Sequence, residues 1–436
     1  MNPRFKRPLQ VIAGIVIVLL GSVAGLGVFL STGKSIGQAH FPSDFLEPFR
    51  YEGAMFDDYW QWSERRLRES RIDEPSEQVI NNLLPFELIP DADCPTNPDG
   101  RYANGIVLVH GLIASPWSMR YLGEYFQTHC FYVIGTLLHG HGSRPGDMLV
   151  SYQEDWQADV AFATRLVAEK AGKVYLSGHS AGATLAVLEA TRNVDVDALI
   201  LFGPAMAVDS ASKYAGGISQ IGKLFPAAAW FEVEPEEGVY RYESFPFTAA
   251  AETWDLIQET QQSLLSHPLD IPVMTVASAQ DTTVDTQATF DFMALQTNPL
   301  SFTLLYAQHE LPPYYRTRVV GSNLPDDGIM SLGHLGLMTP PDHPHYGING
   351  EYRYCGHYYG DGTNNYDRCR NGERDYYGEI TDENLGYGLI ERIAFNPFWN
   401  ELLDEIDLFI QQVSMDRRGV PINPEPERTG PLILDE

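Results

Sequence analysis

The chain has 436 residues, an ordinary apolar content of 44% and a formal net charge of −29. This length exceeds the usual size of a single hydrophobic core, so one α/β core must carry long insertions. A strongly acidic surface repels phosphate backbones and the sequence has no dense run of Lys or Arg. Nucleic-acid binding is therefore not expected.

The N-terminus carries a long uncharged segment, from Val11 to Leu30, preceded by the basic residues Arg4, Lys6 and Arg7. As a helix it would span about 30 Å, the thickness of a bilayer's hydrocarbon core. Positive charge before such a segment predicts a single-pass anchor with a cytoplasmic N-terminus and the remaining chain outside the cytoplasm, in the periplasm of a Gram-negative cell. Secretion after signal cleavage near Ala39 is the alternative, although signal segments are usually shorter.

The elements predicted after this segment alternate between strands and helices. An amphipathic helical region is expected at 45–68, and 79–89 is expected to supply the first strands. Continuous apolar strands are predicted at 105–109, 131–137, 173–176, 198–202, 272–277 and 302–306, the last of these ending the sheet. Helices are predicted from Ser115, which would cap the first of them, at 155–171 and 181–191, from Thr286, and at 396–413. This alternation predicts a mostly parallel sheet with helices on both faces.

Interruptions of the alternation divide the chain into six predicted segments. Residues 205–266 are rich in Ala, Phe, Pro and Glu and are predicted to form an inserted lid, while 308–330 and 340–393 are predicted to be loop-rich excursions. The segments are an anchor or signal segment (1–30), a linker and helical region (31–78), the first part of the core (79–204), the lid (205–266), the second part of the core (267–416) and a tail (417–436).

The four cysteines, Cys94, Cys130, Cys355 and Cys369, form an even set that suits disulfide bonds outside the cytoplasm. Four cysteines permit three pairings, which sequence alone does not distinguish. Proximity in the chain favours Cys355–Cys369, which leaves Cys94–Cys130. Four free thiols are the alternative, and the spacings match no zinc site.

The pentapeptide Gly178-His179-Ser180-Ala181-Gly182 follows an apolar strand-like run and precedes a run of small, helix-forming residues. Gly-x-Ser-x-Gly between a strand and a helix is typical of a nucleophile elbow, where a tight turn exposes a reactive serine. The alternative is a tight turn whose serine has no chemical role. We predict that Ser180 is a catalytic nucleophile.

A serine hydroxyl needs a base within hydrogen-bond reach, and the base needs an acid to orient it. In a nucleophile-elbow architecture the acid and base follow the serine in that order, after later strands. Asp281 comes directly after the predicted strand at 272–277, with Asp285 as the alternative acid. The candidate base is His334, between Gly333 and an apolar stretch, and His309 is the alternative. The remaining histidines of this region, His343, His345 and His357, are expected in surface loops.

An oxyanion hole needs two backbone N–H groups aimed at the developing negative charge. Ala181 follows the nucleophile at a helix N-terminus, where the helix dipole also favours an anion. The second donor is expected in the loop after the strand at 105–109, where Gly111 permits a tight turn and the N–H of Leu112 is the candidate.

Two further stretches carry a resemblance to a known family. Val109 to Arg120 resembles the oxyanion segment of bacterial carboxylesterases and monoacylglycerol-lipase-like enzymes, and Gly140 to Asp147 resembles their Gly-His-Gly-Thr-x-Pro loop. The resemblance is strongest over 105–204 and implies the α/β-hydrolase fold. The chain departs from the family in two respects. His139 stands where a proline is usual, and more residues separate the candidate acid Asp281 from the candidate base His334 than is common in the family.

For Ser180, Asp281 and His334, the resemblance implies the roles of a catalytic triad that cleaves carboxylic esters through an acyl-enzyme. It implies neither a metal nor an organic cofactor. The aromatic lid and the N-terminal segment favour acyl-ester or lipid substrates and contact with a membrane. Thioesterase or other acyl-hydrolase activity on the same triad is an alternative, as is a membrane-tethered binding protein without catalysis. The oligomeric state is not predicted.

Overall fold

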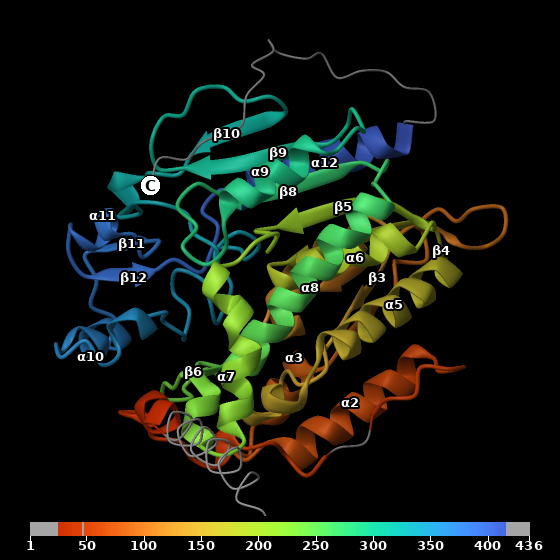
Figure 1. Cartoon of the computed structure of the whole chain (residues 1–436). Helices are drawn as coiled ribbons and strands as arrows, with labels where there is room; N and C mark the ends of the chain where they lie inside the picture. Colours follow the sequence, from red (N-terminus) through yellow and green to blue (C-terminus); the bar gives the residue numbers. More distant parts are fainter. Residues whose placement is uncertain (1–24, 46–47, 416–436) are drawn as a thin grey trace, which may run out of the picture.

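The computed structural model describes residues 25–45 and 48–415, which are arranged around a central sheet (Figure 1). The order of its strands is β1-β3-β2-β4-β5-β8-β9-β10. All neighbours are parallel except β1 and β3, which pair antiparallel. The strands are β1 (Phe86–Leu88), β2 (Tyr102–Val109), β3 (Phe131–Gly135), β4 (Ala171–His179), β5 (Val196–Phe202), β8 (Val273–Ser278), β9 (Phe302–Ala307) and β10 (Thr317–Gly321).

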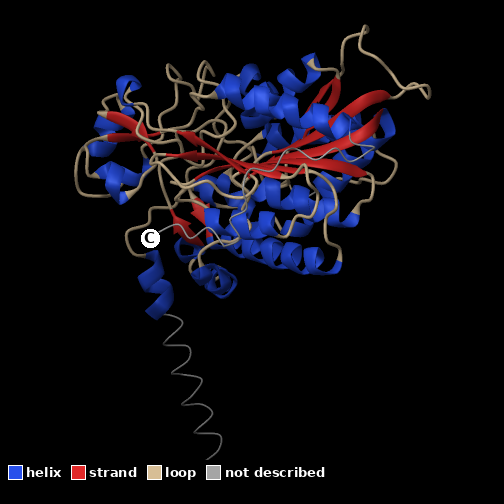
Figure 2. Ribbon diagram, turned by 90° about the horizontal axis from the view of Figure 1, so that it is seen from above, coloured by secondary structure: helices blue, strands red, loops and turns tan. Residues whose placement is uncertain are grey.

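Helices lie on both sides of this sheet (Figure 2), as the sequence predicts. In β2, Ile106 and Leu108 belong to one buried cluster while Val107 and Val109 belong to the other. Successive side chains of a strand point to opposite faces, so an uninterrupted apolar run marks a strand covered on both. One face is covered by α5 (Gln153–Lys170), α6 (Ala181–Arg192), α8 (Phe247–Ser266) and α9 (Thr286–Ala294), and the other by α4 (Arg120–Thr128) and α12 (Trp399–Met415).

The N-terminal region differs from its prediction. Helix α2 (Phe56–Ser70) begins inside the expected helical region and ends two residues beyond it. The stretch 79–89 supplies β1 as predicted, but its residues 79–83 belong to α3 (Glu77–Leu83) instead of a strand. Ser76 explains this difference, because its side chain accepts a hydrogen bond from the N–H of Val79 and so caps the helix. Ser115 occupies the predicted N-cap position and Pro116 is the first helical residue, but the Ser115 side chain makes no capping bond and the element that begins here is a short 3-10 turn before α4.

The segment predicted as a lid leaves the sheet after β5. It forms α7 (Ala215–Gly222), the short antiparallel pair β6 (Trp230–Glu232) and β7 (Phe245–Pro246), and then α8. Helix α8 packs directly against α6, so the C-terminal part of this segment covers the sheet.

The C-terminal half contains strands that the sequence analysis did not predict. The strand β9 does not end the sheet, because β10 pairs with it in parallel along the edge. None of the five residues of β10 is fully buried, and they include Thr, Arg and Gly, so the apolar pattern is too weak to mark a strand. Beyond it, β11 (Tyr376–Gly378) and β12 (Ile390–Arg392) form a separate parallel pair, flanked by α10 (Asn365–Arg370) and α11 (Asp382–Leu385).

Within the described residues, no helix is long and apolar enough to cross a membrane. The predicted anchor begins at Val11, and most of it lies in residues 1–24, outside the described part of the chain. The predicted tail at 417–436 also lies outside it.

Two disulfide bonds have the predicted pairing. Cys94–Cys130 joins the segment before β2 to the residue before β3, and Cys355–Cys369 closes a loop beside α10. Such bonds are typical of proteins from oxidising compartments. The location outside the cytoplasm stays a prediction.

Removing each disulfide should destabilise the fold according to the length of loop it closes. For sequence separations of 36 and 14 residues, the chain-entropy relation gives about 4 kcal/mol for Cys94–Cys130 and about 3 kcal/mol for Cys355–Cys369. Urea unfolding of the full chain and of the two double-alanine variants measures both losses. Variants as stable as the wild type, or thiols that react in the folded, unreduced protein, would contradict the pairing.

Candidate active site

Ser180 forms the turn between β4 and α6 with φ 55° and ψ −121°. A positive φ is strained for a residue with a side chain, and here neighbouring backbone holds it: the N–H of Ser180 donates to the carbonyl of Phe202 at 2.9 Å. The two flanking glycines are sterically required. A Cβ on Gly178 would lie 2.3 Å from the carbonyl oxygen of Gly182, and one on Gly182 would lie 2.4 Å from that of His110.

Asp281 and His334, which the sequence analysis proposed as acid and base, are hydrogen-bonded. Asp281 Oδ2 lies 2.7 Å from His334 Nδ1, and both side chains are almost completely buried. The other carboxylate oxygen accepts the backbone N–H groups of Thr283 and Val284 at 2.8 and 3.0 Å. Because the carboxylate accepts this bond, Nδ1 of His334 carries the proton and neutral His334 has its lone pair on Nε2.

The electrostatics of this pair favour an ionised acid. Burial by itself raises the pKa of Asp281, but the adjacent His334 and the backbone N–H groups outweigh burial. The pKa of Asp281 therefore lies below its ordinary value. An ionised Asp281 fixes the tautomer of the imidazole and stabilises its protonated form.

The alternative acid and base lie elsewhere. His309 is exposed, with Nε2 3.0 Å from Glu383, and it is not among the residues that line the cavity at Ser180. Asp285 is the N-cap of α9 and accepts the N–H of Gln287 at 2.9 Å.

His343 and His345 are buried, contrary to the surface position predicted for them. Their exposed fractions are 2% and 6%. The ring of His343 contacts Trp117, and that of His345 contacts Tyr240. Burial lowers the pKa of His343 to about 3 and that of His345 to about 4, so both are neutral parts of the core. The third, His357, is half-buried and lines the cavity.

The loop at 110–113 and the start of α6 meet beside Ser180: Leu112 and Ala181, the proposed oxyanion donors, both line its cavity. Burial lowers the pKa of His110 to about 4, so its ring is neutral. His110 Nδ1 donates to the carbonyl of Gly111 at 2.8 Å, and Nε2 accepts the N–H of Leu138 at 3.1 Å. These bonds fix the turn from which the N–H of Leu112 projects.

Two buried side chains bind the backbone of His334. Its carbonyl accepts a bond from His179 Nε2 at 3.1 Å, and its N–H donates to Glu379 Oε2 at 2.9 Å. Sequence reasoning assigned His179 to the elbow but missed Glu379 and its partner Arg392, which pairs with it at 2.7 Å. Both residues lie in the excursion at 340–393, where no motif marks them. The only hint of them in the sequence is Gly333, because a residue without a side chain next to His334 leaves room for another group.

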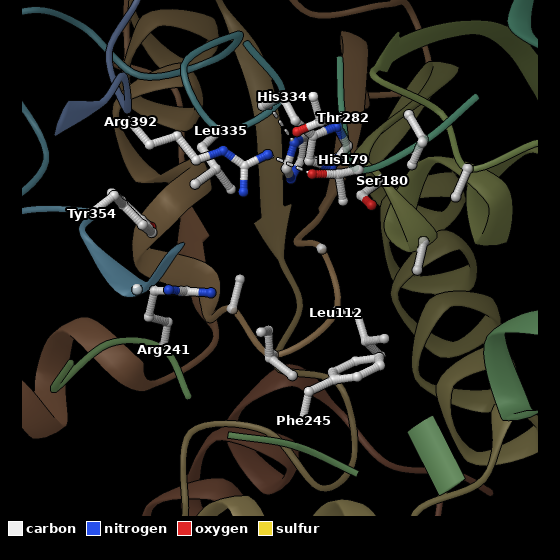
Figure 3. Close-up of a pocket in the computed structure, with 18 of the residues that line it drawn as sticks. Leu112, His179, Ser180, Arg241, Phe245, Thr282, His334, Leu335, Tyr354 and Arg392 are labelled. Carbon is white, nitrogen blue, oxygen red and sulfur yellow. Dashed lines mark hydrogen bonds between the residues drawn. The ribbon is translucent and has the colours of Figure 1, made fainter. Parts of the chain in front are cut away.

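Ser180 and His334 open into a cavity of about 620 Å³ (Figure 3). No hydrogen bond joins their side chains in the described structure, but both lie at the same end of the cavity. The cavity lining includes apolar residues of the oxyanion loop, lid and acid loop, namely Leu112, Ile113, Val208, Phe231, Phe245 and Val284. It also includes charged and tyrosine residues of the lid and C-terminal excursion, namely Arg241, Glu243, Tyr346, Tyr352, Tyr354 and Arg392.

Carboxylates outnumber cations on the cavity wall. The lining residues include the acids Asp209, Glu232, Glu234 and Glu243 and the bases Arg241 and Arg392. Both arginines are paired with carboxylates, Arg241 with Glu243 at 2.8 Å and Arg392 with Glu379. Burial and the neighbouring Glu232 raise the pKa of Glu234 to about 8. The wall therefore offers no excess positive charge to an anionic ligand. In the described part of the chain, no group of three or more His, Cys, Asp or Glu side chains is arranged to hold a metal ion.

Comparisons with known proteins point to hydrolases. Residues 101–304 match the Hydrolase_4 family, described as serine aminopeptidase, S33. A thermostable monoacylglycerol lipase of Bacillus sp. (strain H-257) is 24% identical over 160 residues, which cover 37% of this chain and 64% of the lipase. The match thus spans less than two thirds of that relative.

Solved structures with a similar arrangement include lipolytic enzymes. A structure reported for the metagenome-derived lipolytic enzymes LipS and LipT has a TM-score of 0.38 and 22% sequence identity. The match covers 48% of this chain and 89% of the lipolytic enzyme's chain. A soluble variant of monoglyceride lipase from Saccharomyces cerevisiae has a TM-score of 0.42 at 13% identity, with coverages of 51% and 82%.

The lowered pKa of Asp281 predicts a pH-dependent contribution to stability. A carboxylate whose pKa is lower in the folded than in the unfolded chain stabilises the fold above its unfolded pKa of about 3.9, and this stability is lost as pH falls through the folded pKa. We expect Asp281→Asn to lower the free energy of unfolding by roughly 1–3 kcal/mol at pH 7, with the difference shrinking below about pH 4.

Denaturant titrations of the full chain at several pH values measure this difference. Asp285→Asn is the matched control, because asparagine caps a helix as well as aspartate does and little stability should be lost. A difference for Asp281→Asn that stays constant or grows in acid would contradict the assignment.

Proposed function

We propose that this α/β-hydrolase is a serine hydrolase that cleaves neutral carboxylic esters with Ser180, His334 and Asp281. The observation that carries the proposal is the buried hydrogen bond between Asp281 and His334, which lines the same cavity as the elbow serine. A buried carboxylate that orients an imidazole beside a strained serine is the arrangement that activates a hydroxyl.

The first half of the proposed reaction forms an acyl-enzyme. Ser180 Oγ rotates toward His334, loses its proton to Nε2 and attacks the ester carbonyl carbon. Asp281 stabilises the resulting imidazolium, and the N–H groups of Leu112 and Ala181 bind the oxyanion. The C–O bond of the ester then breaks, and His334 returns the proton to the leaving alcohol.

The second half releases the acid. A water molecule takes the place of the alcohol, gives a proton to His334 and attacks the acyl carbon. The tetrahedral intermediate collapses, Ser180 regains its proton and a carboxylic acid leaves. Every proton transfer in this cycle uses His334, so the proposed mechanism needs no cofactor.

The walls of the cavity favour an uncharged ester with an apolar part. The apolar lining residues Leu112, Phe231 and Phe245 suit an acyl or alkyl chain, because burial of apolar surface is favourable at about 25 cal/mol per Å². The excess of acidic over basic side chains in the cavity lining disfavours an anionic substrate. The partial match to a monoacylglycerol lipase supports an acyl ester as the substrate class.

Hydrolysis of p-nitrophenyl esters of graded acyl length by the full chain tests the proposal. We expect Ser180→Ala and His334→Ala each to lower kcat by roughly 10⁴-fold or more, because triad members act as a unit. His309→Ala is the matched control and should retain the wild-type rate, since its exposed ring pairs with Glu383 instead.

Three results would contradict this account. Activity that survives in His334→Ala but is lost in His309→Ala would assign the base to His309. Faster cleavage of aminoacyl p-nitroanilides than of every ester would show that the site is a peptidase instead of an esterase. A folded wild-type chain that hydrolyses neither class would leave a binding protein without catalysis.

A further inference from the structure

We propose that Glu379 is a positioning residue that, together with Arg392, clamps the loop of the catalytic base to the loop of the catalytic acid. The inference rests on the proposed function, since it takes His334 as the base and Asp281 as the acid. It assigns a role to the small β11–β12 sheet, which the proposed reaction does not otherwise use.

The carboxylate of Glu379 is completely buried and is surrounded by donors. Oε2 accepts the backbone N–H of His334 at 2.9 Å, and Oε1 accepts the hydroxyl of Thr282 and the N–H of Ile380, each at 2.9 Å. Arg392 donates from Nη2 to Oε2 at 3.1 Å, and its Nε lies 2.7 Å from Oε1 as an ion pair that lacks hydrogen-bond geometry. One carboxylate therefore binds the base residue and the residue that follows the acid.

Arg392 makes a second link to the acid loop. Its Nη2 donates to the hydroxyl of Thr283 at 2.6 Å. The backbone N–H of Thr283 in turn donates to Asp281 Oδ1. Nη2 thus donates to both Glu379 and the acid loop, and the planar guanidinium holds this nitrogen in place more firmly than a flexible lysine chain holds an ammonium group.

The backbone on either side is built for this close approach. A Cβ on Gly333 would lie 2.1 Å from Glu379 Oε2, so only glycine leaves room for the carboxylate. The N–H of Glu379 donates to the hydroxyl of Ser331 at 3.0 Å, and the N–H of Met330 donates to the carbonyl of Tyr377 in β11 at 2.8 Å. The chain leading to His334 therefore runs beside β11 and is bonded to it.

The clamp holds His334 at a fixed distance from Asp281. His334 follows β10 through an irregular stretch, whereas Asp281 lies close behind β8, so regular structure alone does not hold the two at a fixed distance. With Glu379 on its N–H and His179 on its carbonyl, both polar backbone groups of His334 are bound. Such support matters because a displacement of about 1 Å in a catalytic group costs up to about a hundredfold in rate.

Glu379→Gln in the full chain tests the clamp. Glutamine keeps the size of the side chain, but its NH₂ group must face a donor where the carboxylate accepted one. We expect kcat for a short p-nitrophenyl ester to fall roughly ten- to a hundredfold with little change in KM. Glu391→Gln is the matched control: Glu391 is a buried carboxylate of the same small sheet, paired with Arg353 and Arg374 at 3.0 and 2.9 Å.

The pH profile gives a readout that a merely structural role would not move. The charged or titratable groups around His334 are Asp281, His179, Glu379 and Arg392. Loss of the Glu379 charge and a looser bond to Asp281 both disfavour the imidazolium. The acid limb of the kcat/KM profile should therefore move to lower pH in Glu379→Gln and stay in place in Glu391→Gln.

A spectroscopic measurement separates failure of this inference from failure of the proposed function. In the full chain labelled with ¹⁵N-histidine, the Nδ1 proton of His334 that is bonded to Asp281 should shift or broaden in Glu379→Gln but not in Glu391→Gln. This readout needs no turnover, so it applies even if the wild type hydrolyses no ester.

Equal losses of kcat in the two variants, or an unchanged Nδ1 resonance and acid limb in Glu379→Gln, would overturn the inference. If Glu379→Gln does not fold, Arg392→Lys decides instead. It keeps the positive charge but not the planar guanidinium, so we expect a smaller loss of kcat in the same direction and a shifted or broadened Nδ1 proton of His334. Wild-type behaviour of Arg392→Lys in both respects would then overturn the clamp.

Discussion

The backbone conformation of Ser180 is the constraint on which the rest of the site depends. A positive φ at a residue with a side chain costs on the order of 1–3 kcal/mol, and it persists only where its surroundings impose it. Here the parallel strands β4 and β5 hold the N–H of Ser180 at the end of the sheet, and bare Gly178 and Gly182 let the strand and helix pack together. The serine is thereby fixed in space, and every other group has to reach it.

Parallel strands bring those groups to one edge of the sheet. The proposed oxyanion loop follows β2, the elbow follows β4 and the proposed acid follows β8, so each needs only a short loop. The proposed base is different, because His334 comes after β10 and an irregular stretch. In the proposed clamp, buried Glu379 and its partner Arg392, both from the C-terminal excursion, supply the support that a short loop would otherwise give.

Much of this arrangement could be predicted from the sequence, because local signals were strong. The strand–turn–helix around Ser180 has apolar runs and glycines in places that only one geometry satisfies. The strand before Asp281 is buried on both faces, and the four cysteines have the pairing that proximity favoured. The sequence favours His334 over His309 through its glycine and apolar neighbours and through the family resemblance, and the hydrogen bond to Asp281 adds a geometric reason.

The remaining features depend on contacts between distant segments. β10 is half-exposed and short, so its sequence lacks the apolar run of a central strand. His343 and His345 are polar in sequence but buried among aromatic rings from other parts of the chain. Glu379 and Arg392 are ordinary charged residues until folding places them behind His334. Nothing local in the sequence marks such pairs, because their role exists only in the folded chain.

Mass spectrometry of the full chain after reaction with a fluorophosphonate ester tests the central claim most directly. An activated serine attacks phosphorus, expels fluoride and keeps a stable phosphonyl group. The account predicts one adduct per chain, located on Ser180 and absent from Ser180→Ala. It also predicts much slower formation of the adduct in His334→Ala. A folded wild-type chain that forms no adduct, or forms it on another residue, would contradict the claim that the elbow holds an activated nucleophile.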